Sequence, residues 1–181
     1  MPRIAPIDPA TATGEVATHL ASVRRQFGTT PNLFATAAHS PPALSAMLGM
    51  FGSLAKASFG VRTGELIAIA VAEANRCGYC LSAHTAIARQ LGLAQNVVEA
   101  ARRAQAADAK TTALLELATA INRTRGHVDD ISLAGARAAG VTDAEIVEVV
   151  ASVALNVFTN YLNSVAKTTI DFPEVTLSAA A

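Results

Sequence analysis

The chain has 181 residues, which is enough for one domain with a substantial core. Its 14 basic and 14 acidic side chains cancel and form no basic patch, which argues against nucleic acid or an anionic membrane surface as a partner. Charged residues make up only 15% of the chain, against about 25% in soluble domains, so we expect some apolar surface to be buried in a homo-oligomer. A compact alanine-rich monomer is the alternative.

The first residues of the chain do not resemble a signal peptide. Met1–Pro9 contains three prolines and an acid but no apolar segment of the required kind. The longest unbroken apolar run, Leu66–Ala72, is far shorter than the about 20 residues of a membrane span. We therefore expect a cytoplasmic protein without a membrane span. In a reducing cytosol, two neighbouring cysteines are typical of a catalytic or metal-binding site rather than of a structural disulfide.

The pattern is helical almost throughout, because apolar residues recur at the spacing of a helix face and no pair of alternating strands is evident. Asp108 and Thr142 are typical helix-starting residues, and Thr142 forms a capping box with Glu145. The sequence therefore predicts an all-α fold, with extended chain from Asp171 onward. The expected helices cover residues 13–27, a short turn from 31, 41–59 ended by Gly60, 64–75 capped by Thr63, 77–91, 108–126, from 129 or 130 to 140, and 142–167.

We expect these helices to form a single domain, a helical bundle over residues 1–181. Its expected parts are a helical lead-in over about 1–58, a redox core over about 60–92 and C-terminal helices over about 94–170. A weak internal sequence similarity relates Glu65–Cys80 to Glu145–Asn160. If real, it would give the domain two related helical hairpins, of which only the first carries chemistry. Chance likeness between two amphipathic helices is the alternative.

The most informative motif contains both cysteines of the chain, Cys77 and Cys80, in a C-x-x-C arrangement. His84 follows Cys80 at the i+4 position, so the two side chains share one face of a helix. Glu65 lies in the preceding apolar helix. Two thiols, an imidazole and a carboxylate are the parts of a dithiol redox site.

A turn in the segment Asn75–Gly78 would bring these groups together, because asparagine and glycine disfavour helix interiors. With the two helices packed antiparallel, Glu65 and His84 lie at similar distances from the turn and can contact each other. The cysteine pair would then occupy the first turn of the second helix. There, unpaired N–H groups and the helix dipole stabilise a thiolate.

Two other interpretations of the cysteine pair stay open at this point. Cys77, Cys80, His84 and Glu65 could bind a metal ion, although a structural zinc site usually has a second cysteine or histidine pair, and the chain has none. The pair could also be purely structural. Glu73 is a rival for the role of base.

The remaining polar residues have less specific contexts. Tyr79 is either a packing residue or a hydrogen-bond donor to a pocket. We interpret the polar group in the last long helix mainly as helix-breaking or subunit-contact residues, with a pocket role as the alternative; its members are Asn156, Asn160, Tyr161 and Asn163. The other histidines, His19, His39 and His127, are expected to be structural or exposed.

The order Glu65, Cys77-Gly78-Tyr79-Cys80, His84 resembles the core motif of the AhpD-like alkylhydroperoxidases of the carboxymuconolactone decarboxylase superfamily. Four flanking segments are similar to the branch called uncharacterised peroxidase-related proteins: Pro31–Phe34, Ala38–Pro41, Asn160–Asn163 and Asp171–Pro173. The resemblance therefore covers nearly the whole chain.

This resemblance implies an all-α fold that assembles as trimers or hexamers. It implies that Cys80 attacks a hydroperoxide and becomes a sulfenic acid, that Cys77 resolves it as a disulfide, and that Glu65 and His84 form a proton relay. It implies no haem, flavin or metal cofactor, and it requires an external thiol reductant or reductase. One departure is Tyr79, which stands where the best-understood peroxidases of this family have a histidine.

The sequence thus predicts a thiol-dependent peroxidase or dithiol–disulfide oxidoreductase. Lactone decarboxylation is disfavoured, because the decarboxylases of the superfamily generally lack the cysteine pair. The alternatives are a redox-sensing oligomer without peroxidase turnover and a metal-binding helical oligomer.

Overall fold

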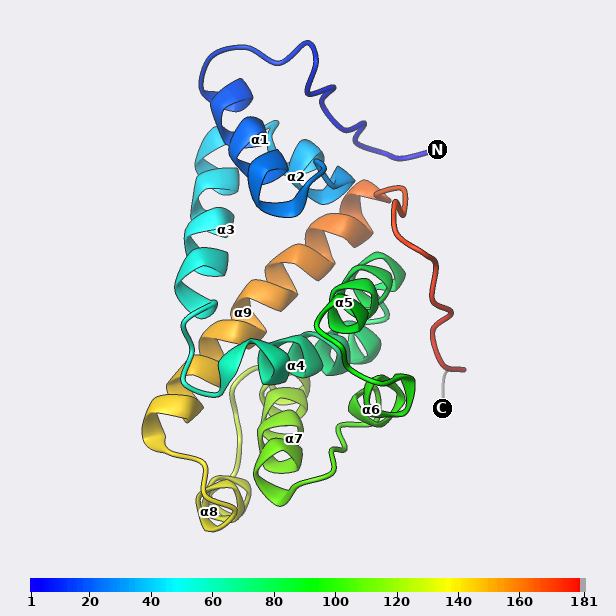
Figure 1. The fold of residues 1–181 in the computed structure, drawn as a ribbon. Coiled ribbons are helices and arrows are strands. Elements are labelled where there is room, and N and C mark those ends of the chain that lie inside the picture. Colours follow the sequence, from blue (N-terminus) through cyan, green and yellow to red (C-terminus); the bar gives the residue numbers. More distant parts are fainter. Residues whose placement is uncertain (180–181) are drawn as a thin grey trace.

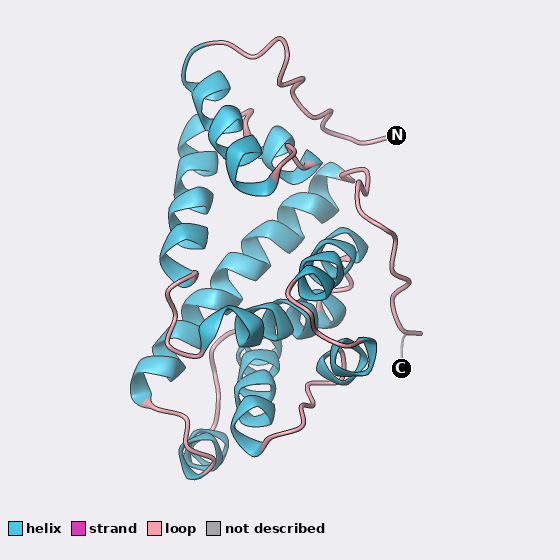
Figure 2. Ribbon diagram, in the orientation of Figure 1, coloured by secondary structure: helices cyan, strands magenta, loops and turns pink. Residues whose placement is uncertain are grey.

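Helices account for the regular structure of the chain, and the prediction of an all-α fold is confirmed. The computed structural model describes residues 1–179, and no strand is present in this part of the chain (Figure 2). The helices of this part are α1 (Gly14–Phe27), α2 (Asn32–Ala37), α3 (Pro41–Leu54), α4 (Gly60–Ala74), α5 (Gly78–Gln90), α6 (Gln95–Ala101), α7 (Ala109–Thr124), α8 (Asp130–Ala138) and α9 (Asp143–Ala166) (Figure 1).

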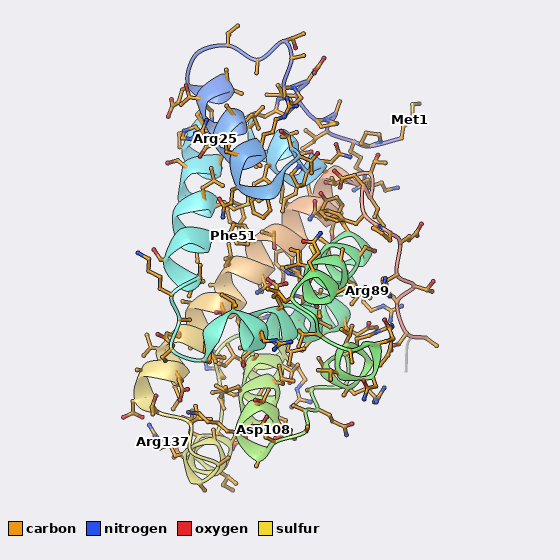
Figure 3. The ribbon with its side chains drawn as sticks, viewed as in Figure 1. Met1, Arg25, Phe51, Arg89, Asp108 and Arg137 are labelled. Carbon is orange, nitrogen blue, oxygen red and sulfur yellow. The ribbon has the colours of Figure 1, made fainter. Side chains whose placement is uncertain are left out.

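Helices α4 and α9 form the centre of the bundle. Helices α5, α6 and α7 pack against α4, and helices α2, α3, α5 and α7 pack against α9. Figure 1 shows α9 running diagonally from the α8 end of the molecule to the α2 end. Buried aliphatic side chains such as Ile67, Leu81, Leu115 and Val149 fill the space between the helices, and Phe51 of α3 lies between α3 and α9 (Figure 3). The α4–α5 pair is therefore held against α9, which positions the cysteine motif.

Helix α9 is the one helix within residues 1–179 that is long and apolar enough to cross a membrane by length and composition alone, with a mean hydropathy of 1.3. Unbroken apolar runs in the sequence did not indicate α9 as a membrane span, because polar residues interrupt its apolar stretch. Its packing is that of a core helix, because 44% of the apolar stretch is buried and the buried residues include Asn156, Asn160 and Asn163. Buried amides that meet protein partners are typical of a helix inside a bundle.

Side-chain caps begin several helices where the sequence predicted them. Asp108 accepts the Thr111 N–H at 2.8 Å, and Thr142 and Glu145 form the predicted capping box. Of the two candidates for the start of α8, Asp129 is the cap, through the Ser132 N–H at 2.7 Å. Each such cap stabilises its helix by about 1 kcal/mol.

Two helix boundaries and one helix differ from the prediction. Helix α3 ends at Leu54 rather than at residue 59, and α4 begins at Gly60 rather than at Gly64. Gly60 was expected to end the helix before it, but it is the first residue of α4. Its left-handed φ of 79° allows the chain to change direction into α4. Thr63 therefore lies within the first turn of α4. Helix α6 was not predicted, since it is short and has no side-chain cap.

The internal similarity between Glu65–Cys80 and Glu145–Asn160 does not correspond to a second helical hairpin. The segment equivalent to the turn after α4 falls within α9, which is one continuous helix from Asp143 to Ala166. The single bundle predicted from the sequence therefore contains the α4–α5 hairpin without a matching partner in α9.

After α9, the chain runs back in extended form along α5 and α6 (Figure 1). Asp171 accepts the N–H of Asn32 at 2.7 Å, and the N–H of Val175 donates to the Ser82 hydroxyl at 3.0 Å. These bonds join the tail to α2 and α5, so the tail covers one side of the cysteine-bearing helix. The extended tail was predicted from Asp171 onward; its last two residues lie outside the described part.

Candidate active site

The α4–α5 turn creates the site. Arg76 adopts a left-handed conformation with φ 57°, and the N–H of Cys77 donates to the Ala72 carbonyl at 2.9 Å, which closes α4. Helix α5 then begins at Gly78, with Cys77 as its N-cap. The predicted turn between residues 75 and 78 is therefore present, and it places Cys77 at the amino end of α5.

The two thiols are buried and in direct contact. The sulfurs of Cys77 and Cys80 lie 2.6 Å apart, and both cysteines are free. The Cys77 sulfur also accepts the N–H of Cys80 at 3.3 Å, so it serves as the side-chain cap of α5. Cys80 lines the large cavity described below. The pair thus combines one sulfur at the helix end with one sulfur at the cavity wall.

The two thiols differ in their tendency to ionise. The hydrogen bond from Cys80 lowers the pKa of Cys77 and outweighs the opposing effect of burial, with further help from the Cys80 N–H and His84. The same bond to Cys77, followed by burial, raises the pKa of Cys80. The first negative charge therefore belongs to Cys77, and the remaining proton lies on Cys80. The helix N-terminus acts on Cys77 rather than on Cys80, because Cys77 occupies the cap.

Glu65 and His84 form the contact predicted from the antiparallel packing of α4 and α5. The His84 Nδ1 lies 2.8 Å from a carboxylate oxygen of Glu65, and the side chains are only 13% and 20% exposed. Burial acts to lower the pKa of His84, but the charge and hydrogen bond of Glu65 outweigh it and raise the pKa overall. Since Nδ1 is engaged by the carboxylate, Nε2 is the nitrogen left for proton exchange.

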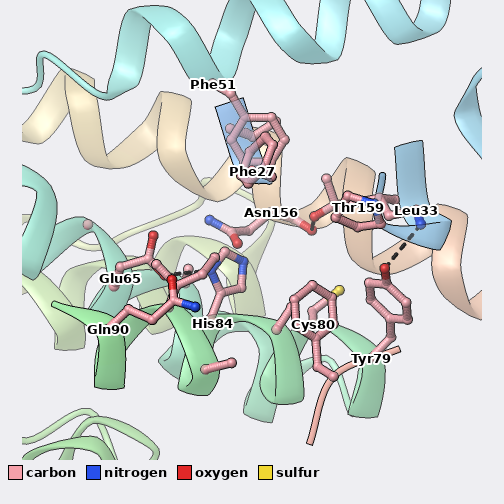
Figure 4. A pocket seen from close by; sticks show the side chains of 18 of the residues that line it. Phe27, Leu33, Phe51, Glu65, Tyr79, Cys80, His84, Gln90, Asn156 and Thr159 are labelled. Carbon is pink, nitrogen blue, oxygen red and sulfur yellow. Dashed lines mark hydrogen bonds and ion pairs between the residues drawn. The ribbon is translucent and has the colours of Figure 1, made fainter. Parts of the chain in front are cut away.

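A cavity of about 740 Å³ connects these groups. Figure 4 shows His84 between Glu65 and Cys80 along one wall, with Asn156 and Thr159 of α9 opposite. Within residues 1–179, no hydrogen bond joins His84 directly to either sulfur, so a proton relay between them needs a water or the substrate itself.

The rest of the cavity is mainly apolar and aromatic. The rings of Phe27 and Phe34 are 5.1 Å apart, and those of Phe34 and Phe51 are 5.8 Å apart. Phe59 and Leu155 also line the wall. An apolar cavity with a few convergent polar groups at one side is the usual form of a small-molecule site.

Tyr79 is both a packing residue and a hydrogen-bonding residue. Its hydroxyl oxygen accepts the N–H of Leu33 at 3.1 Å, and its ring contacts Phe172 edge to face, with centroids 5.7 Å apart. Burial raises the pKa of Tyr79, so the hydroxyl stays protonated at neutral pH. The residue therefore holds α2 and the tail against α5, and it lines the cavity beside Cys80.

Glu73 is engaged elsewhere. It forms a salt bridge with Arg102 at 2.8 Å and accepts the N–H of Ser178 at 2.8 Å. A carboxylate held by these two partners connects α4 to α6 and to the tail, so Glu73 does not fit the role of a base. His19 is half-buried and pairs with the exposed Glu15 at 3.2 Å, which fits the structural role that was one of the two expected for it.

The asparagines of α9 have a role that the sequence analysis did not favour. Asn163 donates an amide N–H to the sulfur of Cys80 at 3.2 Å, and Asn160 accepts from Asn75 at 2.9 Å. They neither break α9 nor lie on its surface, so their interpretation as helix-breaking or subunit-contact residues is wrong. Asn156, Asn160 and Asn163 recur at helical spacing, which was the available signal for a shared buried face. Tyr161 is exposed and remains free for a subunit contact.

The geometry gives no support to a metal site. Within residues 1–179, no three His, Cys, Asp or Glu side chains are arranged to hold a metal ion together. Glu65 and the Nδ1 of His84 bind each other, and the two sulfurs are in contact. The four side chains therefore form two pairs rather than one set of convergent ligands.

Comparison with known proteins gives one family match and several similar structures. Residues 41–120 match the carboxymuconolactone decarboxylase family. No curated protein is significantly similar to the chain. Among solved structures, an uncharacterised peroxidase-related protein with an alkylhydroperoxidase AhpD core from Ralstonia eutropha JMP134 has a TM-score of 0.82 at 23% identity, covering 94% of this chain and 92% of that one.

Two further structures share the fold. An uncharacterised peroxidase-related protein from Silicibacter sp. TM1040 has a TM-score of 0.79 at 23% identity, covering 92% of this chain and 91% of that one. The debrominase Bmp8, solved alone and, with one cysteine replaced by alanine, in complex with 2,3,4-tribromopyrrole, has a TM-score of 0.78 at 22% identity, covering 93% and 91%. At these identities the likeness establishes the fold.

Proposed function

Because residues 41–120 match the carboxymuconolactone decarboxylase family and the fold is shared with a structure of an AhpD core, we propose that the chain is an AhpD-like enzyme of general antioxidant type, a thiol-dependent peroxidase that reduces organic hydroperoxides. The observation that carries this proposal is the shared cavity: the paired Glu65 and His84 and the sulfur of Cys80 line it, with the Cys77 sulfur 2.6 Å from that of Cys80. These are a nucleophile, a resolving thiol and a proton-transfer pair in one place.

The proposed first step is the attack of the Cys80 thiolate on the hydroperoxide. The Cys80 proton passes to the Cys77 sulfur, and Cys80 forms an S–O bond as the O–O bond breaks. The departing alkoxide takes a proton from the imidazolium of His84, whose charge Glu65 balances, and leaves as an alcohol. Cys80 is then a sulfenic acid.

In the second step, the Cys77 sulfur attacks that of Cys80. The S–S bond forms, the S–O bond breaks, and the hydroxide leaves as water with the proton of Cys77. An external dithiol returns the disulfide to two thiols and supplies the two electrons, and one proton returns to His84. Overall, the hydroperoxide and the dithiol give an alcohol, water and an oxidised dithiol.

Steady-state turnover tests this proposal against a redox sensor that reacts only once. We expect the full chain to consume many equivalents of cumene hydroperoxide when a dithiol such as dithiothreitol is supplied in excess. Consumption of a single equivalent, with no turnover above the dithiol blank, would instead support a sensing role.

A second candidate reaction is reductive dehalogenation. It is favoured by the aromatic cavity of about 740 Å³ next to Cys80, together with the shared fold of the debrominase. Here the Cys80 thiolate takes bromine from a bromoarene, which gains a proton, and Cys77 then displaces bromide as the disulfide forms. Bromide release from 2,3,4-tribromopyrrole in the presence of dithiol would show this activity, and its absence would remove this candidate.

We also propose that the protein forms a homo-oligomer, as a trimer or hexamer, in the cytoplasm. Four large apolar side chains remain exposed along α9: Val147, Val150, Tyr161 and Val165. Such a stripe on a chain with no net charge suits contact with a second copy. Val150→Asp combined with Val165→Asp should lower the mass measured by light scattering, whereas a monomeric parent protein would contradict the assembly.

A further inference from the structure

The charge distribution of the cysteine pair raises a question about the attacking sulfur. Cys77 is the N-cap of α5, and its sulfur accepts the N–H of Cys80 and lies 2.6 Å from the Cys80 sulfur; these contacts lower the pKa of Cys77, so the first negative charge lies on Cys77. Cys80, however, is the sulfur at the cavity wall. Transfer of the Cys80 proton to Cys77 creates a thiolate at the wall, and this thiolate needs its own stabilising donors.

Asn163 of α9 supplies such a donor. Its Nδ2 lies 3.2 Å from the Cys80 sulfur, and the residue is only 4% exposed. The contact also helps to lower the pKa of Cys80, against the larger opposing effects of Cys77 and burial. A hydrogen bond that favours the charged form of a buried group acts most strongly where water is excluded.

A chain of three amides, one buried and two half-buried, stands next to this contact. Asn122 donates to Asn75 at 2.8 Å, and Asn75 donates to Asn160 at 2.9 Å. The oxygen of Asn160 is engaged by Asn75, its Nδ2 has no hydrogen-bond partner within residues 1–179, and this amide also helps to lower the pKa of Cys80. Helices α4, α7 and α9 thus fix the orientation of an amide beside the sulfur.

The amide of Asn163 is not explained by packing alone. Its Oδ1 is buried and has no hydrogen-bond partner within residues 1–179, so its polar contact in that part of the chain is the one to Cys80. An unpaired buried acceptor destabilises a fold, and an apolar side chain would avoid this loss. A buried polar atom without a partner requires an explanation, and a catalytic role is one such explanation.

We propose that Asn163 is a further catalytic residue, whose amide N–H holds the negative charge on the Cys80 sulfur as this sulfur attacks its substrate. Asn160 assists from the next turn of α9, and Asn75 and Asn122 are positioning residues that act through Asn160. The assignment rests on the proposed function in naming Cys80 as the nucleophile. It explains how a thiolate can form at the cavity wall although the helix N-terminus favours Cys77.

The test is a pH titration of the Cys80 thiolate in the full chain, with Cys77→Ser as the parent so that a single thiol is observed. The thiolate is followed by ultraviolet absorbance and by the rate of iodoacetamide alkylation. Asn163→Leu keeps nearly the same volume but removes the donor. We expect the pKa of Cys80 to rise by about one to two pH units, and the alkylation rate at neutral pH to fall about tenfold or more.

Three further variants make the result interpretable. Asn163→Asp also lacks the donor and should shift the pKa in the same direction, so the test does not depend on the folding of one variant. Asn122→Leu should give a smaller shift of the same sign. Asn96→Asp, on the exposed surface of α6, adds the same charge far from the sulfur and should leave the titration unchanged.

An unchanged pKa in both Asn163 variants would overturn the proposal. A lowered pKa in Asn163→Leu would also overturn it, because it would mean that the amide oxygen accepts the thiol proton. The titration uses no peroxide, so it remains valid if the protein lacks peroxidase turnover. Conversely, a shifted pKa without turnover would contradict the proposed function and leave the role of Asn163 intact.

Discussion

The α4–α5 hairpin and α9 start with similar sequences but continue with different structures. Each starts with an apolar helical stretch that contains a buried or half-buried glutamate in an early turn, Glu65 in α4 and Glu145 in α9. Glu145 closes the capping box of α9 and pairs with Lys110 at 2.8 Å, so it serves the fold. Glu65 pairs with His84 across the hairpin and faces the cavity. The same residue type thus has a structural role in one helix and a chemical position in the other.

The difference arises from the turn. After α4, the left-handed conformation of Arg76 ends the helix, and α5 starts anew with Cys77 as its cap. In α9, the corresponding residues continue the helix without interruption. A break creates a helix N-terminus and brings two helices side by side, whereas a continuous helix offers only its side-chain face. Accordingly, the hairpin provides the reacting groups and α9 provides amides that contact them.

The largest effect on peroxide reduction is expected from replacing each of the two cysteines separately. Cys80→Ser should abolish peroxide reduction, because the nucleophile is lost. Cys77→Ser should still react once and stop at a sulfenic acid, which dimedone traps and mass spectrometry detects. A trapped sulfenic acid on Cys77 in the Cys80→Ser protein, with retained activity, would reverse the proposed roles.

Replacing Glu65, the carboxylate of the α4–α5 hairpin that faces the cavity, should also reduce peroxidase activity strongly. Glu65→Gln keeps the shape of the side chain but removes the charge that holds the His84 imidazolium, and we expect kcat/KM for peroxide to fall about 10²- to 10⁴-fold. Glutamine can still accept the hydrogen bond of the His84 Nδ1, so the free energy of unfolding should lose only the charge–charge part of this largely buried pair. Activity within twofold of the parent would exclude the proton relay.

The matched exchange in α9 should have the opposite profile. Glu145→Gln weakens the capping box and the ion pair with Lys110, so the free energy of unfolding should fall by about 1–3 kcal/mol. Peroxidase activity of the folded protein should be retained. Chemical denaturation and steady-state kinetics on both glutamine variants would show whether the two glutamates are functionally distinct, as the comparison requires.

A smaller effect concerns pH and His84. Because Glu65 raises the pKa of His84 in the folded protein, protonation of this side chain favours folding. This contribution is fully present below the unfolded pKa of about 6.5 and is lost as the pH rises through the higher folded value. In His84→Gln, the unfolding free energy should therefore lose this part of its pH dependence. Parallel pH profiles for His84→Gln and the parent would contradict the assignment.

Local sequence signals predicted much of the fold and half of the site. The Thr142–Glu145 capping box and the Asp108 cap involve residues close in the chain, so their patterns suffice to place helix starts. The Glu65–His84 contact followed from one turn between two adjacent helices. Helix α6 has no capping side chain and gave no comparable signal.

The contact between Asn163 and Cys80 depends on how α9 packs against α5, two helices far apart in the sequence. Nothing in the local sequence around Asn163 determines that packing, although the helical spacing of the asparagines indicates a shared face. The charge on Cys77 rather than Cys80 likewise depends on the position of the sulfur at the cap, which only the three-dimensional turn reveals.

The most direct test of the account is to treat the reduced full chain with one equivalent of an organic hydroperoxide, and then to count free thiols and measure the intact mass. We predict that both thiols disappear within minutes and that the mass falls by about two daltons, as a Cys77–Cys80 disulfide requires. Two unreacted thiols and an unchanged mass would contradict the assignment of this site as a peroxidase.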